Sequence, residues 1–234
     1  RGVKARNRIV ISPMCQYSAE DGHVTDWHLV HLGKFAQGGA GIVFVGATAV
    51  EKAGHITHGE VGNWGDSHIA GLSRIASFVK QQGAVPAVQL AHAGRKASMA
   101  RPWYGNGPLT QADFDRGDAA WRTVAPTAAA VAEGYSAPRA FEKGDFQVVT
   151  NAFVEGVRRG RAAGFQVIEL HGAHGYLLHS FLSPRSNART DQSMRCRPLP
   201  PKSRPPARSK MPRRGSSRKS QRAGASRPKT GASA

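Results

Sequence analysis

The stretch that decides the fold is Phe165–Tyr176, which reads Phe-Gln-Val-Ile-Glu-Leu-His-Gly-Ala-His-Gly-Tyr. It follows a helical pattern that ends at Ala163-Gly164, and its apolar run Val167–Leu170 has the composition of a short buried strand. Two histidines and a tyrosine come next on a loop punctuated by glycines. Ligands bind at the carboxyl ends of parallel strands, so we expect this loop to face a pocket.

Three more strand patterns precede this stretch. They are Ile9–Ile11, an unbroken β-branched run typical of a fully buried strand, Gly41–Ala47 and Val85–Leu90. Apolar residues at helical spacing predict helices over residues 26–37, 69–82 and 146–163. Alternating strands and helices predict an α/β fold with a parallel sheet covered by helices. Residues 91–145 are predicted to form an elaborated functional loop or a short hairpin.

Charge divides the chain into two parts. Residues 1–192 hold 20 Lys and Arg against 15 Asp and Glu, whereas residues 193–234 hold 13 Lys and Arg and no acid, within a net charge of +18. The second part has no aromatic residue and almost no large aliphatic residue, so it cannot bury a core. We therefore predict a folded domain over residues 1–192 and a disordered basic tail over residues 193–234.

The sequence also indicates the cellular compartment. Two cysteines, Cys15 and Cys196, cannot make a disulfide framework, and no signal segment is recognisable. No run of about 18 apolar residues is present, so no membrane span is expected. A cytoplasmic protein is the expectation.

The pair His171 and His174 leaves two interpretations open from spacing alone. Imidazoles bind zinc, but the pair lies across a strand end and a glycine turn, without a third ligand in a recognisable motif. The other interpretation is that both line an ordinary pocket wall, and we predict no metal site. The glycine cluster Gly38–Gly41 precedes a strand instead of following one, which is the wrong context for a dinucleotide fingerprint.

A polar or glycine-rich segment follows each of the four predicted strands. These segments are Ser12-Pro13-Met14-Cys15-x-Tyr17, Ala47-Thr-Ala49-Val50, Gln89-Leu-Ala-His-Ala-Gly-Arg-Lys96 and His171-Gly-Ala-His174-Gly-Tyr176 with its continuation to Asp191. Taken together, they resemble the old yellow enzyme family of FMN-dependent ene-reductases, which are NADH:flavin oxidoreductases. The resemblance covers residues 4–191 in order, and the Cys15-x-Tyr17 form is similar to the bacterial branch that includes xenobiotic reductases.

The resemblance implies a (β/α)8 TIM barrel with FMN over the carboxyl ends of its strands. Only the first four strands are recognisable here, so the chain is predicted to be the N-terminal half of such a barrel, truncated after the fourth strand. In the family the later half supplies a flavin-contacting arginine and the loops that hold the FMN phosphate. Ser193 onward matches none of it, and its Arg, Pro, Ala, Gly and Ser composition leads us to hypothesise that the coding frame shifts after Gln192.

The resemblance also assigns roles to individual residues. His171 and His174 would bind the carbonyl or nitro oxygen of the substrate, Tyr176 would donate a proton to the α-carbon, and Tyr17 would contact the substrate. Arg95 and Lys96 are interpreted as solvated charges outside the site. The residues expected to contact FMN are Ser12, Pro13, Met14, Cys15, Ala47 and Gln89.

Three functions remain open at this point. The first is an FMN-dependent oxidoreductase that uses NADH or NADPH to reduce activated alkenes, with enones and nitro compounds as candidate substrates and a homo-oligomer as a candidate assembly. The second is an inactive, truncated or frameshifted piece of such an enzyme. The third is a nucleic-acid-binding protein that contacts phosphates through its basic tail. The tail lacks interleaved aromatic residues and any known module, which makes nucleic acid the weakest partner prediction.

Overall fold

The computed structural model describes residues 2–191. The predicted disordered tail and the proposed change of frame after Gln192 lie outside the described residues. Within residues 2–191, no helix combines the length and apolar character needed to cross a bilayer.

A parallel sheet forms the centre of the described part, with strand order β1-β2-β4-β7. The strands are β1 (Val10–Ile11), β2 (Ile42–Ala49), β4 (Val85–Ala91) and β7 (Val167–Leu170). All four predicted strands are confirmed. A further two-residue strand, β3 (Val61–Gly62), pairs with the end of β2 and was not predicted, because two residues in a glycine-rich loop carry no periodic signal.

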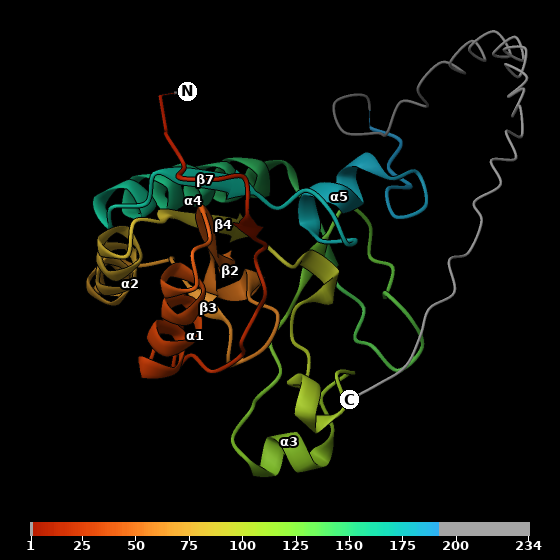
Figure 1. Ribbon diagram of the computed structural model, residues 1–234. Coiled ribbons are helices and arrows are strands. Elements are labelled where there is room, and N and C mark those ends of the chain that lie inside the picture. Colours follow the sequence, from red (N-terminus) through yellow and green to blue (C-terminus); the bar gives the residue numbers. More distant parts are fainter. Residues whose placement is uncertain (1, 192–234) are drawn as a thin grey trace, which may run out of the picture. The chain divides into compact units, whose positions relative to one another are not determined.

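Three helices cover one face of this sheet (Figure 1). They are α1 (Asp26–Gln37), α2 (Ile69–Gln81) and α4 (Lys143–Ala162). Alternate strand residues such as Val43, Val88 and Leu90 point at them and share one buried cluster with Leu72 and Ile75 of α2. This is the arrangement expected when parallel strands are joined by right-handed helical crossovers.

The prediction that the first strand is fully buried was wrong. Val10 is 50% exposed and Ile9 is also exposed, whereas Ile11 packs against the core. The reason is that β1 lies at the edge of the sheet, where β2 is its one strand partner among the described residues. At the opposite edge, Leu170 of β7 is 54% exposed for the same reason.

The segment from residue 92 to 142 is mostly irregular, and the hairpin alternative was wrong. Its two short strands, β5 (Val124–Ala125) and β6 (Arg139–Ala140), pair in parallel. The segment also holds the five-residue helix α3 (Gln111–Asp115), while α5 (Leu177–Leu182) follows the histidine loop. Four single-turn 3₁₀ helices complete the elements, at Lys52–Gly54, Asp66–His68, Gly94–Lys96 and Pro102–Tyr104.

Helix α4 begins three residues before its predicted start. Glu142 is its N-cap, and Asp145 accepts a hydrogen bond from the Glu142 backbone in a reciprocal capping box. Arg139 donates two hydrogen bonds to the Asp145 carboxylate at 2.6 and 2.7 Å. These polar contacts, rather than apolar periodicity, fix the first turn.

Candidate active site

The register of the sheet places three side chains in one row at the carboxyl ends of its strands. Ala47 of β2 is opposite Gln89 of β4, and Gln89 is opposite Glu169 of β7. The Gln89 amide donates a hydrogen bond to the Glu169 carboxylate at 2.6 Å. A small side chain beside a buried amide leaves room for a flat ring to approach and offers it a hydrogen-bonding partner.

The segment after β1 crosses this end of the sheet through two close backbone contacts. A Cβ atom on Gly46 of β2 would lie 2.8 Å from the carbonyl carbon of Met14. A Cβ atom on Gly59 would clash with the carbonyl oxygen of Tyr17. Only glycine admits such contacts without a shift of the backbone. They hold Cys15 and Tyr17 against the cluster that contains Ala47.

The loop after β7 holds the two histidines and the tyrosine together. Ring centroids are 5.0 Å apart for His171 and His174 and 4.7 Å apart for His171 and Tyr176. The backbone N–H of Ala173 donates to Nδ1 of His171 at 3.2 Å, so the hydrogen of the neutral ring lies on Nε2. Burial is the main cause that lowers the pKa of His171, followed by the nearby His174, which favours this neutral donor form.

Two contacts fix the position of this loop. His174 adopts a left-handed backbone conformation with φ of 56°, and its carbonyl oxygen accepts a hydrogen bond from Lys96 Nζ at 2.7 Å. The N–H of Leu177 then donates to the carbonyl oxygen of His92 at 3.0 Å. Lys96 is therefore part of the site, whereas the sequence analysis had left it outside. Its place in the segment from Gln89 to Lys96 was the signal that could have identified it.

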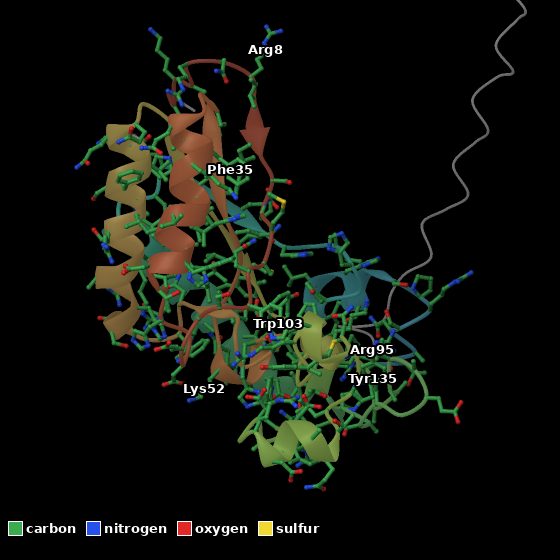
Figure 2. All side chains as sticks on the ribbon, turned by 60° about the horizontal axis from the view of Figure 1, so that its bottom comes forward. Arg8, Phe35, Lys52, Arg95, Trp103 and Tyr135 are labelled. Carbon is green, nitrogen blue, oxygen red and sulfur yellow. The ribbon has the colours of Figure 1, made fainter. Side chains whose placement is uncertain are left out.

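A cavity of about 460 Å³ opens beside this loop. Tyr17, His174 and Tyr176 all line it, although they come from segments more than 150 residues apart. Figure 2 shows Tyr135, another lining residue, in the half of the described part that lies away from Arg8, two residues before β1. The remaining lining residues are Ile56, Lys96, Met99, Asn106, Val131 and Ala132.

The two phenols that line this cavity and the nearby thiol of Cys15 have raised pKa values. Burial, with a contribution from Glu60, raises the pKa of Cys15 to about 12. Burial also raises the pKa of Tyr17 and that of Tyr176 well above the ordinary phenol value, and ionisation of Cys15 would raise both further. Near neutral pH both phenols are therefore hydrogen-bond donors and proton sources.

The structure thus places the predicted substrate and catalytic residues together. His171, His174, Tyr176 and Tyr17 surround one cavity or contact its lining side chains. The predicted flavin residues lie along the adjoining strand ends. Ala47 and Gln89 are buried, Pro13 and Cys15 are half-buried, and Ser12 and Met14 are exposed. Among residues 2–191, no group of three or more His, Cys, Asp or Glu side chains is arranged to hold a metal ion.

A parallel α/β sheet with polar side chains gathered at the carboxyl ends of its strands is typical of barrel-type enzymes. The sequence model described as the NADH:flavin oxidoreductase / NADH oxidase family matches residues 2–194. The chain therefore belongs to this family, which confirms the sequence-based assignment and the flavin and nicotinamide cofactors associated with it.

Curated relatives agree with this family. The chain is 47% identical over 195 residues to the NADH:flavin oxidoreductase FG08077 of Gibberella zeae, which covers 82% of this chain and 46% of the relative. It is 43% identical over 194 residues to an NADPH dehydrogenase of a Geobacillus species, with 82% of this chain and 51% of the relative covered. The chain spans about half the length of the curated relatives it matches.

Solved structures share the fold. Morphinone reductase matches with a TM-score of 0.68 at 24% identity, covering 82% of this chain and 51% of that protein. The Old Yellow Enzyme of a Pichia species matches with a TM-score of 0.68 at 22% identity, covering 81% and 49%. Both likenesses concern the fold alone, and they confirm that the parallel sheet, whose main strands are β1, β2, β4 and β7, corresponds to about half of such a barrel.

Proposed function

We propose that this chain carries the substrate-activating half of an FMN-dependent NAD(P)H oxidoreductase that reduces activated alkenes. The observation that supports it most is the cavity lined by Tyr17, His174 and Tyr176, with His171 packed against the last two. Enones and nitro compounds are the substrate classes with an oxygen that the two histidines could bind.

The strand ends fit one edge of a flavin. Gln89 would hydrogen-bond the ring through its amide, Ala47 would leave space for the ring plane, and the polarisable thiol of Cys15 would lie beside it. Ser12, Pro13 and Met14 would contact it from the segment after β1. When bound, FMN supplies the hydride that NADH or NADPH has delivered to it.

The histidine pair would bind and polarise the substrate oxygen. His171 has its Nε2 hydrogen available because Nδ1 already accepts from Ala173. Two N–H donors directed at one oxygen stabilise the negative charge that develops there as the double bond is reduced, and one such donor contributes about 3 kcal/mol. Lys96 holds His174 in place through the backbone carbonyl.

Tyr176 would complete the reduction by transferring its phenolic proton to the α-carbon. Its raised pKa, which is caused mainly by burial, keeps the hydroxyl protonated until the developing carbanion accepts the proton. Tyr17 faces the same cavity and would contact the substrate.

The test is the visible absorption spectrum of the purified 234-residue chain after gel filtration and incubation with FMN. We expect a protein-bound flavin band that NADPH or NADH bleaches and that an enone restores under anaerobic conditions. A folded chain that retains no flavin would refute the proposal for this chain and favour the alternative of an inactive part of such an enzyme. A flavin that NAD(P)H bleaches but that neither an enone nor a nitroalkene restores would refute the substrate class.

A further inference from the structure

A second, much smaller cavity lies beside Cys15 and shares Tyr17 with the substrate cavity. It measures about 10 Å³, and its polar lining residues include Cys15, His28 of α1 and Glu60 of the loop before β3. Glu60 is 1% exposed and His28 is 2% exposed. Among residues 2–191, no Lys or Arg side chain lines this cavity.

Glu60 brings an unpaired acceptor to the cavity. One of its carboxylate oxygens, Oε2, accepts a hydrogen bond from the backbone N–H of Ile56, whereas Oε1 is buried and has no partner among the described residues. Burial raises the pKa of this carboxyl group well above its usual value. A buried carboxyl oxygen without a hydrogen-bond partner destabilises the folded state. A partner for Glu60 Oε1 is therefore expected in this cavity.

His28 brings an unpaired donor to the same cavity. Its Nδ1 accepts the backbone N–H of Thr25 at 3.1 Å in the capping box of α1, so the ring hydrogen lies on Nε2. This Nε2 is buried and has no partner among the described residues. Burial lowers the pKa of His28 to about 4, so the ring is a neutral donor at neutral pH.

We propose that one buried water joins His28 Nε2 to Glu60 Oε1, and that this pair acts as a positioning unit that keeps the Cys15 thiol protonated beside the flavin. A volume of about 10 Å³ is close to what one water needs, and a buried water requires two or more polar partners, which these atoms provide. The consequence for catalysis rests on the proposed function, but the water-linked pair and its effect on the thiol do not.

The pair controls Cys15 through the charge of Glu60. When Glu60 is ionised, its negative charge opposes the formation of a thiolate on Cys15, and the tyrosines that share its surroundings, Tyr17 and Tyr176, experience the same repulsion. The donor from His28, relayed by the water, stabilises the ionised form of Glu60. Loss of either partner should therefore make Cys15 easier to ionise at alkaline pH.

The experiment measures alkylation of Cys15 by iodoacetamide from pH 6 to 10 in the full chain without FMN, in a C196S background, with quantification by mass spectrometry. Alkylation follows the thiolate fraction, so a fall of one pKa unit gives about a tenfold faster reaction. Glu60 opposes the thiolate only when it is itself ionised, and burial shifts that ionisation to higher pH. For E60Q we therefore expect a ratio to the parent chain that rises with pH as Glu60 ionises, to about tenfold at pH 10. E155Q, which removes an exposed carboxylate on α4, should leave the rate unchanged at every pH.

H28Q separates the water-linked pair from a simple effect of Glu60. Glutamine at this third helical position can keep the capping box, because its amide oxygen can accept the Thr25 backbone N–H, but it replaces the rigid ring Nε2–H by a flexible amide donor that orders the water less firmly. We expect H28Q to accelerate alkylation at pH 10 by about threefold and the H28Q/E60Q double variant to match E60Q. This non-additivity is the signature of one coupled unit.

Three results would overturn the proposal. The first is a change of less than twofold in E60Q at pH 10. The second is an E60Q effect of equal size at every pH, which would show that the effect does not follow the ionisation of Glu60. The third is multiplication of the H28Q and E60Q effects. Circular dichroism checks that each variant folds, and H28Q alone decides the matter if E60Q does not. All readouts use the flavin-free chain, so failure of the proposed function leaves this test intact.

Discussion

Truncation of Leu177 to alanine should destabilise the fold at the point where the histidine loop is fixed. Leu177 is 1% exposed, its N–H binds the His92 carbonyl, and its backbone lies close to Gly94. Removal of a buried leucine side chain costs 2–5 kcal/mol, with the lower values at sites that can relax. Leu177 also lines an apolar groove of about 370 Å³, into which its neighbours can move, so we expect about 2.5 kcal/mol.

Leu182 provides a matched control on the same helix, because it is 71% exposed. Urea unfolding should show a midpoint lower by about 1 M for L177A, for an m value of about 2 kcal/mol per molar, and a change within about 0.5 kcal/mol for L182A. Equal effects of the two substitutions, or a loss below 1 kcal/mol for L177A, would refute the view that Leu177 anchors the loop that carries His174 and Tyr176.

Further predictions concern the same site and the buried histidines. In flavin-loaded protein, Y176F should leave flavin reduction by NAD(P)H intact and slow reoxidation by an enone about 100-fold or more in stopped-flow measurements; equal slowing of both steps would exclude a specific proton donor. K96M should accelerate hydrogen exchange around His174 about fivefold, as expected for an exposed charged hydrogen bond of about 1 kcal/mol, whereas unchanged exchange would show that Lys96 does not hold the loop. Burial lowers the pKa values of His28 and His55 to about 4. The unfolded chain therefore binds protons first, so stability is full above pH 6.5 and is lost as the pH falls toward 4. Urea midpoints across this range should fall less steeply in H55Q, and an identical slope would contradict this cause.

Most of the fold could be predicted from the sequence because its signals are local and periodic. The four strands and three long helices occur where apolar periodicity placed them, since each buries one face against the others. The start of α4 could not be predicted in this way, because it depends on Asp145 and on Arg139, which lies outside the helix. The exposure of Val10 could not be predicted either, because it depends on what lies beyond the edge of the sheet.

The sequence allowed the candidate site residues to be proposed, and the structure brings them together, but the residues that support them carried no sequence signal. The residues that end strands were recognised as motifs, and parallel register brings such ends together regardless of sequence distance. Lys96 was missed because a lysine that binds a backbone carbonyl looks in sequence like any solvated lysine. Glu60 and His28 were missed because nothing in a glycine-rich loop or an amphipathic helix indicates that two polar side chains face one small cavity.

The two open edges of the sheet bear both on flavin binding and on assembly. Among the described residues, β1 and β7 each have one strand partner, and apolar side chains of α4, β7 and α5 line the open groove beside β7. Uncovered edges of this kind are removed when a barrel closes. Glu169, which accepts a hydrogen bond from the Gln89 amide, lies on the β7 edge, so the row of Ala47, Gln89 and Glu169 that is proposed to face the flavin ends where the sheet is open. A second chain that pairs with this edge would therefore also form one side of the proposed flavin site. For this reason the flavin spectrum is best measured together with the oligomeric state of each gel-filtration fraction.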